Sequence, residues 1–278
     1  MVIIWRRALL RALCGLVITA MAATGAGAAG ELAGGFTHSQ VRLLQGEFEG
    51  DSWSAGVQID LAEGWKTYWS MPGEAGIAPH FDWARSLNVA DIELRWPAPA
   101  RYHDASGETI GYADRVVFPV TVRPLDPDQP VELVLDLSYA VCRDLCVPAR
   151  VKLSQTFDRK TAMSSLDSVL IGEFDSQVPQ PEAQGLGIAR ASVEDRDGAL
   201  RLVVVLEGPA ADASTDIFVE NFERAYFRAA RLEARSGNAS IFHLPIDDLA
   251  SPGELRGQTL RLTVVTATAR LVGDVTVE

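Results

Sequence analysis

Two cysteines separated by three residues are the side chains of this chain best suited to chemistry. They lie in the segment Tyr139-Ala-Val-Cys142-Arg-Asp-Leu-Cys146-Val-Pro148. Four fully extended residues span about 13 Å, whereas a disulfide needs its two Cα atoms within roughly 7 Å of each other. A bond between Cys142 and Cys146 therefore requires the strand that ends near Val141 to break into a turn.

Such a bond closes a loop of only about five residues, for which chain entropy predicts roughly 2 kcal/mol of stabilisation. Because the disulfide would stabilise the fold so little, a role in redox exchange is favoured over a structural role. Arg143 would favour a thiolate at Cys142, and Asp144 would oppose it. An inert hairpin disulfide is the alternative interpretation.

A metal site is the competing chemistry, since two thiolates can hold Cu(I) or share Zn²⁺. After the first 28 residues the chain has two methionines, and its four histidines are scattered over the sequence: Met71 and Met163; His38, His80, His103 and His243. No ligand spacing of the C-x-x-C or H-x-x-x-H type appears, and the hydrolase and phosphate-loop motifs are absent as well. We therefore expect no metal site and no cofactor.

The first 28 residues are typical of an export signal. Arg6, Arg7 and Arg11 precede an apolar run from Ala12 to Ala23, and Ala26-Gly27-Ala28 fits a cleavage site. The run is about half of a membrane span, so we expect a cleaved signal, with a retained anchor as the alternative, and a periplasmic protein. The net charge of −12 becomes −15 without these arginines, which argues against nucleic-acid partners.

The chain from Val41 to Phe157 is mostly strand-like. Apolar and polar residues alternate in several short runs, which turn residues such as Glu63-Gly64 and Asp126-Pro-Asp128 separate. The clearest runs are Val57–Leu61, Asp91–Trp96, Val116–Val122 and Val131–Leu137. Short strands of this kind predict an antiparallel sandwich.

A short helix and a linker follow this region. Met163, Leu166, Leu170 and Phe174 have helical spacing, and 177–187 is rich in Pro, Gly and Gln. A second strand-rich stretch has its clearest strands at Leu200–Leu206, Ile241–Leu244, Thr259–Thr266 and Leu271–Val277. We predict an all-β chain of two antiparallel β-sandwich domains, with residues 1–28 as signal, 29–158 as the first domain, 159–187 as helix and linker, and 188–278 as the second domain.

Several motifs in the first domain occur in an order that resembles a known family. They are Gly64-Trp-Lys-Thr-Tyr-Trp69, Pro72-Gly-Glu-Ala-Gly76, Phe81-Asp-Trp83, Trp96-Pro97, Ile110-Gly-Tyr112, Phe118-Pro-Val120 and Tyr139-x-x-Cys-x-x-x-Cys-x-Pro148. The stretch 38–157 is similar to the N-terminal periplasmic domain of the thiol–disulfide interchange protein DsbD, and more closely to its ScsB relatives from copper-sensitivity suppressor systems.

The resemblance implies an immunoglobulin-like sandwich that exchanges electrons with periplasmic thioredoxin-fold proteins and receives them from a separate membrane protein. Its activity would be that of a thiol–disulfide oxidoreductase in a copper-tolerance or disulfide-reduction pathway. The alternative is a non-enzymatic interaction or metal-handling module with a structural disulfide. By resemblance, Cys142 and Cys146 are the redox pair, and the supporting and cap residues are Trp65, Tyr68, Tyr102, His103, Asp104, Glu108 and Tyr139.

Two features depart from the family pattern. The cysteine spacing is shorter, and the cap segment Asp104–Glu108 contains no phenylalanine, so we expect His103 or Tyr102 to cover the pair. The second domain has no cysteine and no tryptophan. Its aromatic cluster, Phe218, Phe222, Tyr226 and Phe227, is predicted to fill its own core, with a docking surface for the first domain or for a partner as the alternative. The linker predicts that few contacts cross between the domains.

Overall fold

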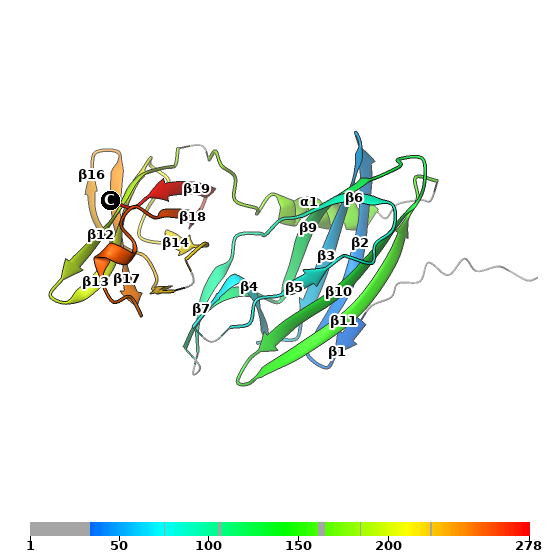
Figure 1. The fold of residues 1–278 in the computed structure, drawn as a ribbon, viewed down its shortest axis with the longest axis horizontal. Helices are drawn as coiled ribbons and strands as arrows, with labels where there is room; N and C mark the ends of the chain where they lie inside the picture. Colours follow the sequence, from blue (N-terminus) through cyan, green and yellow to red (C-terminus); the bar gives the residue numbers. More distant parts are fainter. Residues whose placement is uncertain (1–33, 75, 105–106, 161–164, 184, 223) are drawn as a thin grey trace, which may run out of the picture. The chain divides into compact units, whose positions relative to one another are not determined.

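The computed structural model describes residues 34–278, except 75, 105–106, 161–164, 184 and 223. The predicted export signal lies outside the described residues. Residues Glu31–Glu278 form one compact unit that contains two antiparallel β-sandwiches (Figure 1). Among the described residues, no helix has the length and apolar character to cross a membrane.

The first sandwich consists of two sheets. One has the strand order β1-β2-β3-β9-β6, with β1 Gly34–Phe36, β2 Ser39–Glu49, β3 Ser52–Leu61, β9 Arg115–Pro124 and β6 Val89–Leu94. The other has the order β11-β10-β4-β8-β7, with β11 Cys146–Phe157, β10 Val131–Cys142, β4 Lys66–Gly73, β8 Gly107–Ala113 and β7 Ala100–Asp104; β5 His80–Asp82 pairs with β10. Every predicted strand of this half is present, and the all-β, immunoglobulin-like class is confirmed.

The core lies between these two sheets. It includes Trp53, Phe118, Leu135 and Phe157, all of which are almost completely buried. Strand β9 is apolar on both faces because one face meets this core and the other lies under a helix, where Val117 packs against Ile171. A continuous apolar run rather than an alternating one is what burial on both faces requires.

The helix α1 spans Ser165–Asp175 and covers the outer face of strands β2, β3 and β9. Leu170, Ile171 and Phe174 pack on that face, as the helical spacing predicted for two of them. Leu166, also predicted to face inward, is 79% exposed. Asp167, the next residue of the helix, is buried instead and pairs with Arg42 of β2 at 3.0 Å. Met163 lies outside the described residues.

The second sandwich is smaller. One sheet has the order β12-β13-β17-β15, with β12 Gly187–Arg196, β13 Ala199–Glu207, β17 Ala239–Asp247 and β15 Tyr226–Phe227; β16 Arg231–Ser236 pairs with β17. The other has the order β14-β18-β19, with β14 Asp216–Val219, β18 Thr259–Val265 and β19 Arg270–Thr276, and a 3-10 turn spans Pro252–Glu254. Its own core joins both sheets through residues such as Leu202, Phe242 and Leu262.

Among the described residues, no strand of one sandwich pairs with a strand of the other, and the contacts that cross between them are made by single side chains. Gln180 hydrogen-bonds with the backbone of β19 at Arg270 and Val272, and Gln177 O accepts from Ala98 N at 2.8 Å in the first domain. Phe218 of the second domain belongs to the core cluster of the first, where its ring lies edge-on to Trp69 at 5.6 Å. The Pro, Gly and Gln residues of the linker predict irregular structure. Irregular structure does not prevent side chains of the two sandwiches from contacting each other.

Candidate functional site

The cysteine pair closes the end of the β10–β11 hairpin. The two strands pair from Val131–Phe157 to Cys142–Cys146, so the cysteines are directly opposite each other. Their Cα atoms are 4.2 Å apart and the two sulfurs form a disulfide. The turn that the sequence required is the three residues Arg143, Asp144 and Leu145.

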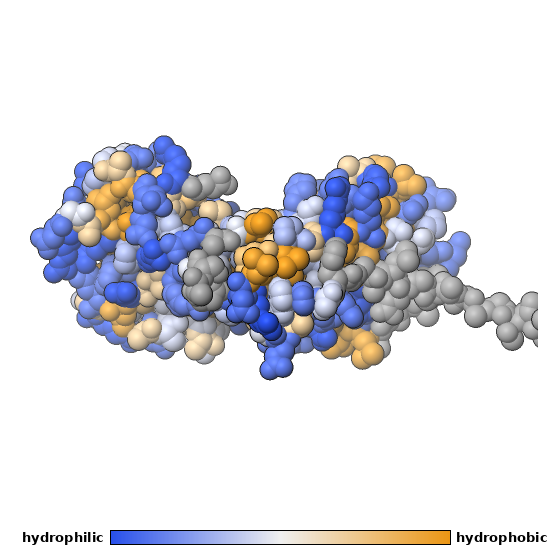
Figure 2. Space-filling view, turned by 90° about the horizontal axis from the view of Figure 1, so that it is seen from below, coloured by the Kyte–Doolittle hydropathy of each residue, from blue (hydrophilic) through white to orange (hydrophobic). Residues whose placement is uncertain are grey.

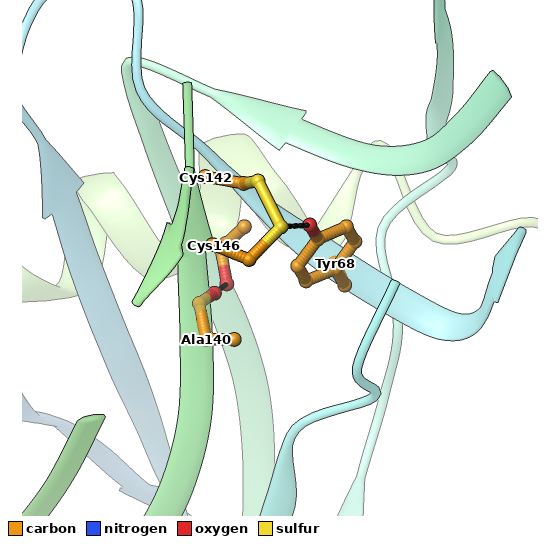
Figure 3. Close-up of a disulfide and its surroundings, with 5 residues drawn as sticks. Tyr68, Ala140, Cys142 and Cys146 are labelled. Carbon is orange, nitrogen blue, oxygen red and sulfur yellow. Dashed lines mark hydrogen bonds between the residues drawn. A yellow bond between two sulfur atoms is a disulfide. The ribbon is translucent and has the colours of Figure 1, made fainter. Parts of the chain in front are cut away.

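The two sulfurs differ in exposure and in their partners. Cys142 is buried at 2% exposure, whereas Cys146 is only partly buried. The Tyr68 hydroxyl lies 3.1 Å from Cys146 Sγ and, since a disulfide sulfur carries no proton, the hydroxyl is the donor (Figure 3). The site therefore has one buried and one partly exposed cysteine, with a hydrogen-bond donor beside the sulfur of the partly exposed one.

Strand β4 brings Tyr68 to this position. Lys66 pairs with Cys142 in the sheet, and the Thr67 hydroxyl donates to Ala140 O at 2.9 Å, which joins the two strands where their ladder ends. Because side chains alternate along a strand, Lys66 and Tyr68 lie on the same face as the disulfide. Tyr68, Ala140 and the two cysteines form a small cluster on that face.

The turn of the hairpin lies against Trp65. The Arg143 guanidinium is 5.6 Å from the Trp65 ring and 2.9 Å from the Asp144 carboxylate, and both charged side chains are exposed. His38 stacks on Trp65 with ring centroids 3.8 Å apart. Gly64, with φ of +77°, leaves room for the Arg143 stem, which would lie 3.2 Å from any Cβ there. Trp65 therefore supports the turn and does not touch the sulfurs in this arrangement.

The predicted cap residues separate into two groups. Tyr102 lies on the disulfide side, with Lys66 Nζ 5.2 Å from its ring, and burial raises the pKa of its phenol. His103 is 70% exposed and pairs with Glu108 at 3.3 Å. Asp104 ends β7, and its side chain is outside the described part of the structure.

The structure does not bring Glu108 or Tyr139 to the disulfide. Glu108 is buried and bonds with Arg101 at 2.6 Å. Tyr139 faces the first core, where its hydroxyl is 2.8 Å from Ser39 Oγ, and burial raises its pKa. Tyr139 and Cys142 are three positions apart in strand β10, and strand alternation therefore places their side chains on opposite faces of the sheet.

Sequence analysis missed Thr67, Arg101 and Glu74, which hold the surroundings of the pair in place. A single arginine in a strand carries no motif, so no signal singled out Arg101. Across the described ranges, no group of three or more His, Cys, Asp or Glu side chains is arranged to hold a metal ion.

The comparisons with known protein families match the two sandwiches separately. Residues 40–158 match the family model "Thiol:disulfide interchange protein DsbD, N-terminal", and residues 177–277 match a domain of unknown function, DUF8393. Comparison with curated proteins finds no match. The crystal structure of the N-terminal periplasmic domain of ScsB from Proteus mirabilis is similar in fold, with 24% identity and a TM-score of 0.70 over 89% of this chain and 97% of that one. Residues 40–158 of this chain are therefore similar in sequence to the N-terminal domain of DsbD, and the chain is similar in fold to the ScsB domain.

Proposed function

We propose that this protein exchanges disulfides with thioredoxin-fold partners through Cys142 and Cys146. The observation that supports this most is the unequal environment of the two cysteines: Cys146 is partly exposed and next to the Tyr68 hydroxyl, and Cys142 is buried. A disulfide that only stabilises the fold requires neither an exposed cysteine nor a hydrogen-bond donor beside its sulfur.

The exchange begins at the accessible sulfur. A partner thiolate attacks Cys146 Sγ, the disulfide breaks, and Cys142 leaves as a thiolate that takes up a proton. The second partner thiolate then attacks the partner sulfur of the mixed disulfide and releases Cys146. Two electrons pass from the partner dithiol to the cysteine pair, and the reverse sequence passes them to an oxidised partner. The Tyr68 hydroxyl stabilises the negative charge on Cys146 in either direction.

The surface beside the disulfide suits protein docking. Leu145 at the hairpin tip is 72% exposed and Ile77 is 49% exposed. A groove of about 540 Å³ runs along the hairpin and is lined by Ile77, His80, Pro148 and Arg150, among others. Exposed apolar side chains around a reactive group are typical of an interaction site.

Trapping of the mixed disulfide tests the proposal. Cys142→Ala leaves Cys146 without its resolving partner, so we expect a thiol-sensitive adduct with a thioredoxin-fold protein. Cys146→Ala is the matched control, for which we expect little adduct because Cys142 is buried. A reduction potential above about −300 mV accompanies exchange. If neither variant forms an adduct and the potential lies well below that value, the disulfide is structural.

We further propose that residues 1–28 direct export to the periplasm and that a separate membrane protein supplies electrons. The solved relative is described as a periplasmic domain, which supports this location. N-terminal sequencing of the protein from a periplasmic fraction should begin near Ala29; an intact N-terminus would contradict it. A role in copper tolerance is proposed from the sequence resemblance alone, and cells that carry Cys142→Ala should then lose copper resistance.

A further inference from the structure

A buried cluster of charged groups joins the second domain to the β7–β8 hairpin of the first. Arg101 of β7 is 5% exposed and Glu108 of β8 is 3% exposed. The guanidinium donates through Nε to Asp216 at 2.9 Å and through Nη1 to Glu108 at 2.6 Å and to the Tyr226 hydroxyl at 3.1 Å. Asp216 and Tyr226 belong to the second domain, so this one side chain connects both.

The charged groups of this cluster have several hydrogen-bond partners each. Arg101 also donates to the backbone carbonyls of Ile217 and Phe227, and its guanidinium lies 5.0 Å from the Phe218 ring. Burial lowers the pKa of Arg101, but the hydrogen bond and charge of Asp216, with Glu108, raise it above its ordinary value overall. Arg101 is therefore charged, and loss of one partner would leave a buried charge only partly compensated.

The β7–β8 hairpin has two faces with different neighbours. Arg101 is opposite Ile110, and His103 is opposite Glu108; these residues share the face that meets the second domain. Tyr102 and Thr109 lie on the other face, together with Gly111, which pairs with Tyr68. The hairpin thus contacts the second domain with one face and borders the disulfide side of the sheet with the other.

A second link reaches Tyr68 more directly. Arg228 of the second domain donates to the Glu74 carboxylate at 2.8 and 3.2 Å, and Glu108 N donates to the same carboxylate at 3.1 Å. Glu74 is two positions before Gly76, which packs against both Pro72 and the Tyr68 ring. A Cβ at Gly76 would lie 2.7 Å from that ring, so the contact is close.

Space exists for this segment to move if its anchors are lost. A cavity of about 740 Å³ lies along the same contact region and is lined by Pro72, Glu74, Arg101, Phe218 and Tyr226, among others. Without the Glu74–Arg228 and Arg101–Asp216 bonds, Pro72 and Glu74 would have room to shift into this cavity, and the close contacts of Gly76 with Pro72 and Tyr68 would pass the shift to the ring. A small shift of Tyr68 is enough to break its 3.1 Å hydrogen bond.

We propose that Arg101, Glu108 and Glu74 are positioning residues for the exchange site, and that the second domain, through Asp216 and Arg228, holds the Tyr68 hydroxyl against Cys146. The proposal deepens the proposed function, because its biological meaning rests on thiol–disulfide exchange at Cys146. It also gives the second domain a role without any redox group of its own.

The pH profile of Cys146 alkylation tests this role. In the full chain with Cys142→Ala, iodoacetamide labelling of the Cys146 peptide is followed by mass spectrometry. We expect Asp216→Asn to raise the pKa of the Cys146 thiol, so that labelling at pH 7 slows by about threefold. The matched control is Asp274→Asn, which removes an acid that pairs with Arg261 at 3.7 Å within the second domain; we expect no change.

A double-mutant cycle identifies the route of the effect. In a Tyr68→Phe background, Asp216→Asn should slow labelling no further, because the hydroxyl through which it acts is gone. Glu74→Gln, at a partly exposed position, provides a second variant whose folding is checked by circular dichroism, and we expect it to slow labelling as well. Equal labelling in Asp216→Asn and Asp274→Asn, or an undiminished effect without the Tyr68 hydroxyl, would overturn the proposal. These measurements need no partner protein, so their failure is distinct from a failure to trap an adduct.

Discussion

The two sandwiches differ in chemistry far more than in architecture. Both are antiparallel and both have an apolar core between two sheets. The first holds the disulfide and the rings around it, whereas the second holds no cysteine and offers acids, arginines and one phenylalanine to the first. The comparison teaches that a domain without reactive groups can still belong to a reactive site, because the packing and charge pairing it supplies decide where the reactive groups lie.

The largest effect should come from Phe218, which completes the core of the neighbouring domain. Phe218→Ala should lower the free energy of unfolding by about 3–5 kcal/mol, the usual cost of a large cavity. The described tryptophans, Trp53, Trp65, Trp69, Trp83 and Trp96, all lie in the first domain, so their fluorescence reports that domain during urea unfolding. If the domains were independent, this fluorescence transition would not move. Phe242→Ala, in the second core, should move it less.

Removal of the disulfide should have a smaller effect. The Cys142→Ala, Cys146→Ala double variant should lose about 2 kcal/mol or less, because the closed loop is short and the strand ladder continues to the last pair. Urea unfolding of the oxidised wild type and the double variant gives the difference. Collapse of the first sandwich in the double variant would show that the disulfide is a staple, and the contrast between the two domains would lose its functional meaning.

Loss of the Tyr68 hydroxyl should mainly affect the reduced protein. Tyr68→Phe should raise the pKa of the Cys146 thiol by about one unit, or about 1.4 kcal/mol, since hydrogen bonds to charged groups are worth roughly that much at a partly exposed site. Thiol absorbance or alkylation against pH measures it. Tyr102→Phe is the control, because Tyr102 contacts Lys66. An unchanged pKa in Tyr68→Phe would show that the hydroxyl leaves the thiolate unaffected.

The smallest predicted effect is the dependence of stability on pH that comes from Glu74. The hydrogen bond from Glu108 N, together with the charge of Arg228, lowers the pKa of Glu74 below its ordinary value of 4.5, although desolvation opposes this. The stabilisation it provides is therefore complete above about pH 4.5 and is lost as pH falls through the lowered value. The melting temperatures of wild type and Glu74→Gln should differ at neutral pH and converge in acid. A constant difference across this range would exclude Glu74 as the titrating group.

Some of the site could be predicted from the sequence because it depends on local spacing. The turn between Cys142 and Cys146 and the alternation of the strands follow from short segments and are present in the structure. Tyr68 was named only through the resemblance to a known family, and the structure places its hydroxyl beside Cys146. Glu108 and Tyr139 also lie in recognisable segments, but the structure places them away from the sulfurs. The family resemblance identifies the segments in which these two residues lie. It does not identify the face of the strand on which each side chain lies.

The aromatic cluster of the second domain illustrates the same limit. Phe222 and Phe227 fill its own core and lie 6.1 Å apart, as the simpler prediction stated. Phe218 and Tyr226, close to them in sequence, contact the first domain instead. Composition and periodicity are the same for both pairs, so they could not tell inward-facing rings from interdomain ones.

The sequence by itself determined the all-β class and the positions of the strands along the chain. It also determined that the cysteine pair is isolated and needs a turn. These features depend on residues within a few positions of one another. Only the tertiary structure decided that Cys146 is the more exposed cysteine, that Tyr68 donates to it, and that Arg101, Asp216 and Glu108 meet in one buried cluster. Asp216 is 115 residues from Arg101 in the chain, and no local propensity predicts a contact over such a distance. Their meeting follows from burial and charge pairing, which exist only once both sandwiches have packed together.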